Sequence, residues 1–328
     1  MTAPLIFVRY LITYLVVGAA LLSPLSRADS AEIPHIAVVL PEAAVASLEV
    51  GLREGFREQD YVEGRDIVIE WRHIGGSIED ARPHVAELVR SKVALILALN
   101  TSSARAAMEA TSTIPIVFLS ADPVATGLAK SMARPGGNAT GVSAASPELV
   151  AKRLDLLHQV LPHVRRVAFL RNPNNANIEK QSAEAQKAAR QLGLQLEAFD
   201  ARNAAEIDTS LRAIQRSAPG AILIASDQWL LKEKARIVSA IRKARIPAMF
   251  PWKEYHEDGA LMSYGPDLKE IWRRAAFYVV RILKGANPAE LPVEEVSKFD
   301  LVFDLRVARE LKIEVPQELL YRADEVIR

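Results

Sequence analysis

Short apolar runs alternate with amphipathic stretches along most of this chain. The runs are rich in valine, isoleucine, leucine and alanine, as in 93–99 (VALILAL), which is typical of strands buried on both faces of a sheet. The stretches between them place apolar residues at helical spacing. In the first half, the pattern predicts strands at 35–40, 66–72, 93–99 and 114–119, and helices at 45–59, 78–91 and from 100–102 through 111.

The same alternation repeats after residue 166. It predicts strands at 167–170, 195–199, 221–225, 247–250 and 260–264, with helices at 178–192, 204–217 and 230–244. A long helix at 267–284 and a strand at 299–303 then imply that the chain crosses back between two halves. We predict an α/β protein with two doubly wound parallel-sheet lobes joined by a hinge. The predicted N-terminal lobe is 29–144 plus 266–296, and the predicted C-terminal lobe is 145–265 plus 297–328.

An uncharged apolar run near the N-terminus predicts an export signal. Arg9 precedes the run 11–22, which is shorter than the roughly 20 residues that span a bilayer. Pro24 ends the run, and Ser26 and Ala28 supply the small residues typical of a cleavage site. We therefore predict a signal peptide over 1–28 and a soluble, periplasmic protein. An uncleaved membrane anchor is the alternative.

Charge and composition exclude several classes of protein. The 41 basic and 40 acidic residues give a net charge of +1, without the basic excess typical of nucleic-acid binders. Cysteine is absent, which removes disulfides, thiolate catalysis, iron–sulfur clusters and cysteine-ligated zinc. The glycine-rich phosphate loops, the G-x-S-x-G elbow and the H-E-x-x-H motif are missing. We expect no cofactor, no metal, no nucleic-acid partner and no enzymatic activity.

The six histidines form no catalytic pattern. None follows a predicted strand with a serine or aspartate at a suggestive spacing. The triplet His256-Glu257-Asp258 is interpreted as a solvated helix end rather than a metal site, because adjacent residues of a helix point in different directions.

Polar and aromatic residues follow several predicted strands. Ligands of open α/β sheets bind outside the carboxyl ends of the strands, so these residues are candidates for a binding site. The candidates are Thr101, Ser102, Asp122, Asp227, Trp252 and Tyr264. Hydroxyls at a helix start suit a carboxylate, an acid can pair with an amine, and an aromatic ring can cover an apolar group. Helix capping and ordinary packing are the alternatives, and Trp229 and Trp272 are interpreted as packing residues.

Several longer segments resemble one known family, the ABC-transporter substrate-binding proteins of the tryptophan/tyrosine type. The resemblance covers nearly all of the chain after residue 28. It is carried by 114–143 (IPIVFLSADPVATGLAKSMARPGGNATGVS), 166–174 (RVAFLRNPN), 250–268 (FPWKEYHEDGALMSYGPDL), 291–304 (LPVEEVSKFDLVFD) and 311–322, which contains Pro316.

The resemblance implies a type I periplasmic-binding fold that holds a small, amino-acid-like or aromatic ligand between two lobes. It implies delivery of that ligand to an inner-membrane ABC permease, by a protein that is usually a monomer. By position, Thr101, Ser102 and Asp122 would line one wall, and Asn172, Asn174, Asp227, Trp252 and Tyr264 the other. Glu42 lies in the family's opening loop, and Arg171 would either select an anionic ligand or face solvent.

Three functions therefore stay open. The first is a periplasmic solute receptor in which ligand binding shifts an open–closed equilibrium of the lobes. The second is a ligand-sensing receptor for a membrane signalling protein. The third is a secreted hydrolase, for which Asp122 and Asp227 are the carboxylate pair that the sequence offers.

Overall fold

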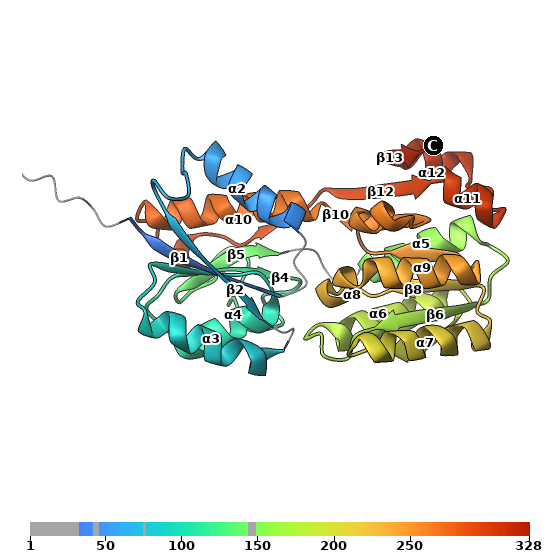
Figure 1. The fold of residues 1–328 in the computed structure, drawn as a ribbon, viewed down its shortest axis with the longest axis horizontal. Coiled ribbons are helices and arrows are strands. Elements are labelled where there is room, and N and C mark those ends of the chain that lie inside the picture. Colours follow the sequence, from blue (N-terminus) through green and yellow to red (C-terminus); the bar gives the residue numbers. More distant parts are fainter. Residues whose placement is uncertain (1–32, 42–45, 75–76, 144–148) are drawn as a thin grey trace, which may run out of the picture. The chain divides into compact units, whose positions relative to one another are not determined.

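Two β-sheets organise the described part of the chain, which in this computed structural model is residues 33–41, 46–74, 77–143 and 149–328 (Figure 1). The predicted signal peptide and Glu42 lie outside the described residues. Each sheet has its own winding and its own covering helices, which confirms the predicted two-lobe α/β architecture. Within the described residues, no helix combines the length and the apolar character needed to cross a membrane.

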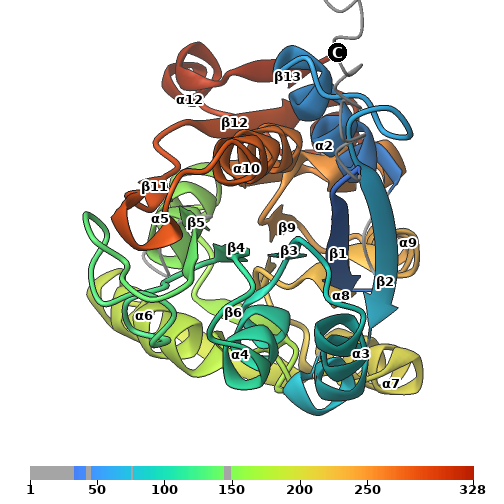
Figure 2. The same cartoon turned by 90° about the vertical axis from the view of Figure 1, so that its left-hand side faces the viewer.

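The first sheet has the strand order β11-β5-β4-β3-β1-β2, and its neighbouring strands run parallel (Figure 2). Its strands are β1 (His35–Pro41), β2 (Val68–Ile74), β3 (Leu95–Ala98), β4 (Ile116–Ser120), β5 (Ala139–Ser143) and β11 (Glu294–Glu295). The apolar pattern does not predict β5, whose sequence ATGVS is short and weakly apolar. Gly141 in this strand lies so close to β4 that a Cβ atom would stand 2.0 Å from the Phe118 carbonyl oxygen.

The second sheet has the order β13-β12-β10-β9-β8-β6-β7. Its strands are β6 (Arg166–Arg171), β7 (Gln195–Asp200), β8 (Ala221–Ile224), β9 (Ala248–Phe250), β10 (Met262–Pro266), β12 (Phe299–Asp304) and β13 (Glu325–Ile327). Strand β12 is antiparallel to β10, so this sheet is mixed at one edge rather than parallel throughout. The order β7-β6-β8-β9-β10 repeats the order β2-β1-β3-β4-β5 of the first sheet.

Helices cover both faces of each sheet. In the first lobe α2 (Ala46–Glu58) and α10 (Leu268–Leu283) pack on one face, and α3 (Ile78–Arg90) and α4 (Thr101–Ala110) on the other (Figure 1). In the second lobe α5 (Leu149–Val160) and α6 (Ile178–Gln191) pack together, as do α7 (Ala204–Ser217) and α9 (Lys234–Ala244). The remaining elements are α8 (Gln228–Lys232), α11 (Leu305–Leu311), α12 (Gln317–Arg322) and the short 3₁₀ helices η1 (Lys253–Asp258) and η2 (Pro288–Glu290).

The continuous apolar runs become strands because successive side chains serve two cores. In β1, Ile36, Val38 and Leu40 belong to the core under α2 and α10. The alternating residues Ala37 and Val39 belong to the separate core under α3 and α4. This period of two, with both faces buried, gives a run with no polar position.

The chain passes between the lobes three times, between β5 and α5, between β10 and α10, and between β11 and β12. Lys253 ties the last two passages together, because its Nζ lies 2.6 Å from Asp267 and 3.2 Å from Asp300. Asp267 also caps α10 by accepting hydrogen bonds from two backbone N–H groups of its first turn. The residue boundaries of the two lobes stay a prediction.

Two glycines of α2 let α10 pack closely against this helix on the first sheet. At Gly51 a Cβ atom would lie 2.7 Å from the Lys269 carbonyl oxygen, and at Gly55 it would lie 2.5 Å from that of Arg273. Both distances are shorter than van der Waals contact. The spacing of four residues puts both glycines on one face of α2, so the two helix backbones meet along that face.

Candidate functional site

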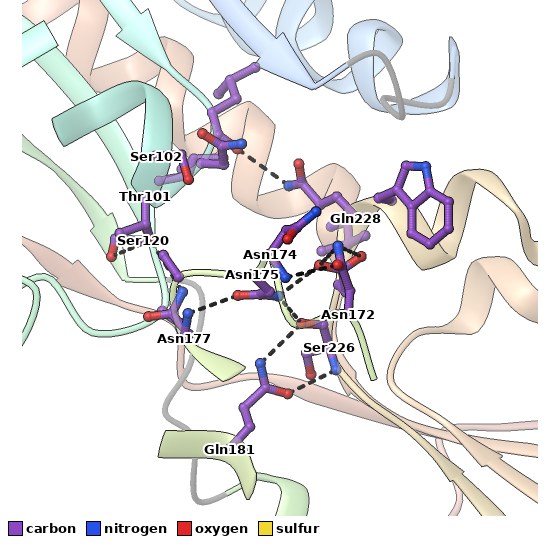
Figure 3. Close-up of a pocket in the computed structure, with 18 of the residues that line it drawn as sticks. Thr101, Ser102, Ser120, Asn172, Asn174, Asn175, Asn177, Gln181, Ser226 and Gln228 are labelled. Atoms are coloured by element: carbon purple, nitrogen blue, oxygen red, sulfur yellow. Dashed lines mark hydrogen bonds between the residues drawn. The ribbon is translucent and has the colours of Figure 1, made fainter. Parts of the chain in front are cut away.

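The strand order predicts a candidate binding site at the point where the order of strands reverses in each sheet. In a sheet of order 2-1-3-4-5 this point lies between the first and third strands, at their carboxyl ends. Those positions are β1 and β3 in the first sheet, and β6 and β8 in the second. A cavity of about 480 Å³ lies there, lined by residues that follow the strands of both sheets (Figure 3).

The N-terminus of α4 forms the first-lobe wall. Asn100 caps the helix, with its Oδ1 2.7 Å from the Ser103 backbone nitrogen. Thr101 and Ser102 follow it at the cavity and are both nearly buried. The Thr101 hydroxyl lies 3.1 Å from that of Ser120, at the end of β4. The first N–H groups of a helix have no intrahelical acceptor, so this wall offers donors and hydroxyls to an anionic group.

Asp227 is the centre of the second-lobe wall. Its Oδ1 accepts a hydrogen bond from the Leu230 N–H at 2.8 Å, and its Oδ2 accepts one from Asn175 at 2.9 Å. Asn172 approaches both oxygens at 3.3 Å. Burial raises the pKa of Asp227, although these donors oppose the shift. The carboxylate therefore holds the loop after β6 against the loop after β8. Because its oxygens already accept these hydrogen bonds, Asp227 has little capacity left to pair with a ligand amine, the role that the sequence suggested for it.

Arg153 lies at the base of the cavity and is 2% exposed. Its Nε donates to the Tyr264 carbonyl oxygen at 2.6 Å, and its Nη1 donates to the Ser226 hydroxyl at 2.7 Å. Among the residues that the structure describes, no carboxylate pairs with it. Burial lowers the pKa of Arg153 to about 9, so the guanidinium stays charged at neutral pH. Gln181 completes the base by exchanging two hydrogen bonds with the Ser226 backbone.

Tryptophans supply the apolar part of the lining. Trp252 lines the cavity as expected, and so do Trp229 and Trp272, which the sequence assigned to packing. Trp272 lines the cavity and is also a packing residue, since it is 1% exposed and belongs to the hydrophobic core. Trp229 is only partly buried, so its interpretation as a packing residue is incomplete.

The candidates predicted from the sequence fall into three groups. Thr101, Ser102, Asn172, Asn174, Asp227 and Trp252 line the cavity together. Tyr264 does not line it, because its ring packs against Phe299 with centroids 6.0 Å apart. Asp122 does not line it either, and Glu42 lies outside the described residues. Whether the residues of the first group contact a ligand stays a prediction.

Two other polar residues have structural partners. Arg171 lies outside the cavity lining, where it binds Asp200 at 2.7 Å and Ser182 at 2.8 Å. His256 is 8% exposed, and its Nε2 lies 3.0 Å from the Ser263 hydroxyl. The interpretation of 256–258 as a solvated helix end is therefore wrong for His256. Across the described ranges, no group of three or more acidic or histidine side chains is placed to hold a metal.

Several cavity residues are not among the candidates predicted from the sequence. They are Arg153, Asn175, Asn177, Gln181, Ser226 and Gln228. Asn175 and Asn177 lie in the same loop as Asn172 and Asn174, and Gln228 follows Asp227 as the first residue of α8, so extending the candidates by a few positions would have found them. Arg153 gives no such signal, because it lies within the amphipathic helix α5.

Among the described residues, contacts at the cavity and beside it join the two lobes. Asn177 Nδ2 lies 3.3 Å from the Thr101 hydroxyl, and Gln228 Nε2 lies 3.3 Å from the Leu99 carbonyl oxygen. Asp122 forms an ion pair with Lys180 of the second lobe. Partial burial opposes its ionisation, but Lys180 and the Ala125 N–H hold the pKa of Asp122 below its ordinary value. The structure therefore shows the lobes closed on one another.

We expect Asp122→Asn to weaken ligand binding about three-fold, because partly exposed ion pairs contribute only about 0–1 kcal/mol. The loss should shrink in about 0.5 M NaCl, where the wild-type pair is itself screened. Titration calorimetry at low and high salt measures both effects. Asp155→Asn is the matched control, since Asp155 pairs with Lys152 inside one lobe. Equal effects of the two variants would show that the Asp122–Lys180 pair does not contribute to closure.

Fold and cavity together define a two-lobe solute-binding protein, and comparisons with known proteins agree. A family model described as ABC transporter substrate binding protein matches residues 35–327. The chain belongs to this family.

The chain is also similar to individual proteins, one of them described as binding an amino acid. A tyrosine-binding protein of Clostridioides difficile (strain R20291) is 22% identical over 255 residues, which cover 77% of this chain and 73% of the relative. An ABC domain from Streptococcus pneumonia in complex with L-Trp superposes with a TM-score of 0.82 at 26% identity, over 90% of this chain and 99% of the other. A conserved domain protein of Vibrio cholerae superposes equally well, with a TM-score of 0.82 at 28% identity, over 90% of this chain and all of the other.

Proposed function

We propose that this protein is a periplasmic receptor that captures an amino-acid-like or aromatic solute between its lobes and delivers it to an inner-membrane ABC importer. The observation that carries the proposal is the cavity itself, closed between two lobes and lined by hydroxyls, amides and tryptophans. Its volume of about 480 Å³ lies in the range of roughly 300–1,000 Å³ typical of small-molecule sites. The L-Trp complex and the tyrosine-binding relative support the ligand class.

The proposed binding mode follows from the lining. The ligand carboxylate lies at the N-terminus of α4, where Thr101 and Ser102 present donors. The apolar part of the ligand packs against Trp252 and its neighbouring tryptophans. Closure of the lobes around this solute produces the form that the permease recognises.

We place the protein in the periplasm, exported by the signal peptide 1–28, and we propose that it acts as a monomer with lobes close to the predicted boundaries. A signalling receptor would use the same closed form. The hydrolase alternative has less support, because Asp122, one member of its carboxylate pair, does not line the cavity.

A thermal-shift screen tests the function. The purified protein is unfolded and refolded to remove any bound solute, and is then heated with L-tryptophan, L-tyrosine, other amino acids, purines and sugars. A ligand at 100 times its dissociation constant raises the stability of the native state by about 2.7 kcal/mol, a readily measured shift in Tm. We expect aromatic amino acids to give the largest shift. If no amino acid or aromatic acid shifts the Tm, the proposed ligand class is wrong.

Trp252→Leu should weaken binding of the best ligand by about 10- to 100-fold, because it removes about 1–3 kcal/mol of aromatic contact. Trp71→Leu is the matched control. Trp71 lies outside the cavity lining, under the Arg53 guanidinium at 4.9 Å. Calorimetry on both variants measures the difference, and equal losses would place the ligand elsewhere.

A further inference from the structure

Arg153 is a buried cation that has no anionic partner. It lines the base of the cavity and is almost completely buried. Its two hydrogen bonds go to uncharged oxygens, the Tyr264 carbonyl and the Ser226 hydroxyl, and no described carboxylate pairs with it. A charge taken out of water is unfavourable unless it is paired, so buried charges in native proteins usually have an opposite charge beside them.

The guanidinium of Arg153 also has free donors. Of the five N–H groups of an arginine, the contacts to Tyr264 and Ser226 use one at Nε and one at Nη1. Nη2 donates to no described residue, yet it is not among the unpartnered atoms that lack accessible surface. Nη2 therefore keeps accessible surface. Because Arg153 lines the cavity, a solute held there can reach this nitrogen.

Neither carboxylate of the described cavity lining supplies the missing charge. Asp227 already accepts hydrogen bonds from a helix N–H group and from two asparagine side chains. Asp80 lies in the exposed first turn of α3, where it accepts a hydrogen bond from the Ser77 hydroxyl at 2.7 Å. The cavity therefore contains a positive charge that its own described residues do not neutralise.

The two other cations of the described lining are exposed. Arg202 pairs with Glu206 at 3.1 Å and with Asp200 at 3.6 Å. Lys232 is exposed at the end of α8. Water and salt weaken the attraction of exposed groups for an anion, whereas a buried cation is screened much less. Of the three, Arg153 is thus the cation that gains most from an anionic ligand group.

We propose that the solute carries a second acidic group, in addition to the carboxylate at the N-terminus of α4, and that this second group pairs with Arg153. This inference rests on the proposed function and narrows its ligand class to amino-acid-like or aromatic solutes with an acidic side chain. Helix α4 packs on the first sheet and α5, which carries Arg153, on the second. The two acidic groups of one solute are then held by different lobes, so binding favours closure.

The size of the effect follows from the chemistry of the pair. A hydrogen bond to a charged group favours an acid over its uncharged isostere by about 10- to 100-fold. The preference should persist in about 0.5 M NaCl, because the guanidinium is buried. An attraction to the exposed Arg202 or Lys232 would instead decline with salt.

Pairs of ligands that differ only in this charge measure the preference. The probes are 4-carboxy-L-phenylalanine beside 4-carbamoyl-L-phenylalanine, and L-glutamate beside L-glutamine. Each pair has nearly the same shape, and each member keeps the carboxylate proposed for α4. Titration calorimetry gives the ratio of the amide's dissociation constant to that of the acid. L-tryptophan and L-tyrosine are titrated beside them as a test of the proposed function itself.

We expect the wild type to prefer the acid in at least one pair by about ten-fold or more, and Arg153→Met to abolish that preference. Arg153→Lys keeps a positive charge and should retain part of it. Arg171→Met is the matched control, since Arg171 pairs with Asp200 outside the cavity lining, and it should leave the ratio unchanged. Thermal unfolding confirms that each variant is folded, and the wild-type ratios at low and high salt need no variant.

Each result supports or overturns the inference. If the wild type binds L-tryptophan, L-tyrosine or a probe but shows no preference for an acid, the inference is overturned and the proposed function stands. If the preference declines in high salt, or persists in folded Arg153→Met, another cation carries it, and the inference is also overturned. If the wild type binds none of these compounds, the proposed function fails and this inference fails with it.

Discussion

Replacing Asp227 with alanine is expected to lower the free energy of unfolding by about 3 kcal/mol, because it strands several buried donors. The backbone N–H of Leu230 loses its cap, and the side-chain amides of Asn172 and Asn175 lose their acceptor. Each buried donor left without a partner costs about 1–3 kcal/mol, and a lost N-cap about 1 kcal/mol. Part of this cost is offset because the variant no longer buries a carboxylate whose pKa is raised by burial.

Urea unfolding measures the loss, and three further observations interpret it. Asp227→Asn keeps one acceptor oxygen and should lose about half as much. Asp208→Ala, at an exposed ion pair with Arg236, should change stability by less than about 0.5 kcal/mol. The affinities of L-tryptophan and of its analogue without the amino group, 3-indolepropionate, should fall together in Asp227→Ala. A selective loss of the amino acids would instead make Asp227 the partner of the amine, as the sequence suggested.

The second large expected effect concerns the pH dependence of stability, because two residues of η1 change protonation in opposite directions when the protein folds. Burial raises the pKa of Glu254 to about 7 from an ordinary 4.5, and lowers the pKa of His256 to about 4 from 6.5. Glu254 Oε2 and His256 Nδ1 are both buried without a hydrogen-bond partner. Between about pH 5 and 6.5, folding therefore makes Glu254 take up a proton and His256 release one.

The two groups act on stability in opposite directions. The contribution of Glu254 is complete below its unfolded pKa and is lost as the pH rises through about 7. The contribution of His256 is complete above its unfolded pKa and is lost as the pH falls through about 4. In the wild type the two dependences largely cancel across this window.

Single substitutions expose the separate slopes. In Glu254→Gln only His256 remains, so the free energy of unfolding should rise by about 2 kcal/mol from pH 5 to 6.5. In His256→Gln only Glu254 remains, so it should fall by about 2 kcal/mol over the same interval. The double variant should be nearly flat again, like the wild type. Urea unfolding at several pH values measures all four proteins, and parallel profiles for the two single variants would rule out the exchange.

The strands of the sheet centres could be predicted because both of their faces are buried. The runs at 36–40 and 114–119 have no polar position, and they supply most of β1 and β4. Strand β5 gave no such signal, because Gly141 must lack a side chain to lie against Phe118. Its small residues reflect the closeness of a neighbouring strand, which no local pattern can show. Strand β11 has only two residues and depends on pairing with β5.

For the candidate site, the sequence could predict residues that directly follow a strand, but not contacts between residues distant in the chain. The rule that ligands bind beyond strand ends led to Thr101, Ser102 and Trp252, which do line the cavity. It also led to Asp122, because sequence does not show that Lys180 of the other lobe lies beside it. The contact of Gln228 with the other lobe could not be predicted, since its partner Leu99 lies 129 positions earlier in the chain.

Helix α10 comes late in the sequence but packs on the first sheet, and this limits the order in which the protein can fold. The face of the first sheet formed by Ile36, Val38 and Leu40 shares its core with α10, a helix that begins at Leu268. Every strand of the second sheet from β6 to β10 is synthesised before that helix. N-terminal domains usually fold first as a chain is made, but here the first lobe has to wait for residues near the C-terminus. A nascent or truncated chain ending before Leu268 would carry an apolar face covered by α2 alone, so aggregation during synthesis is the hazard of this topology.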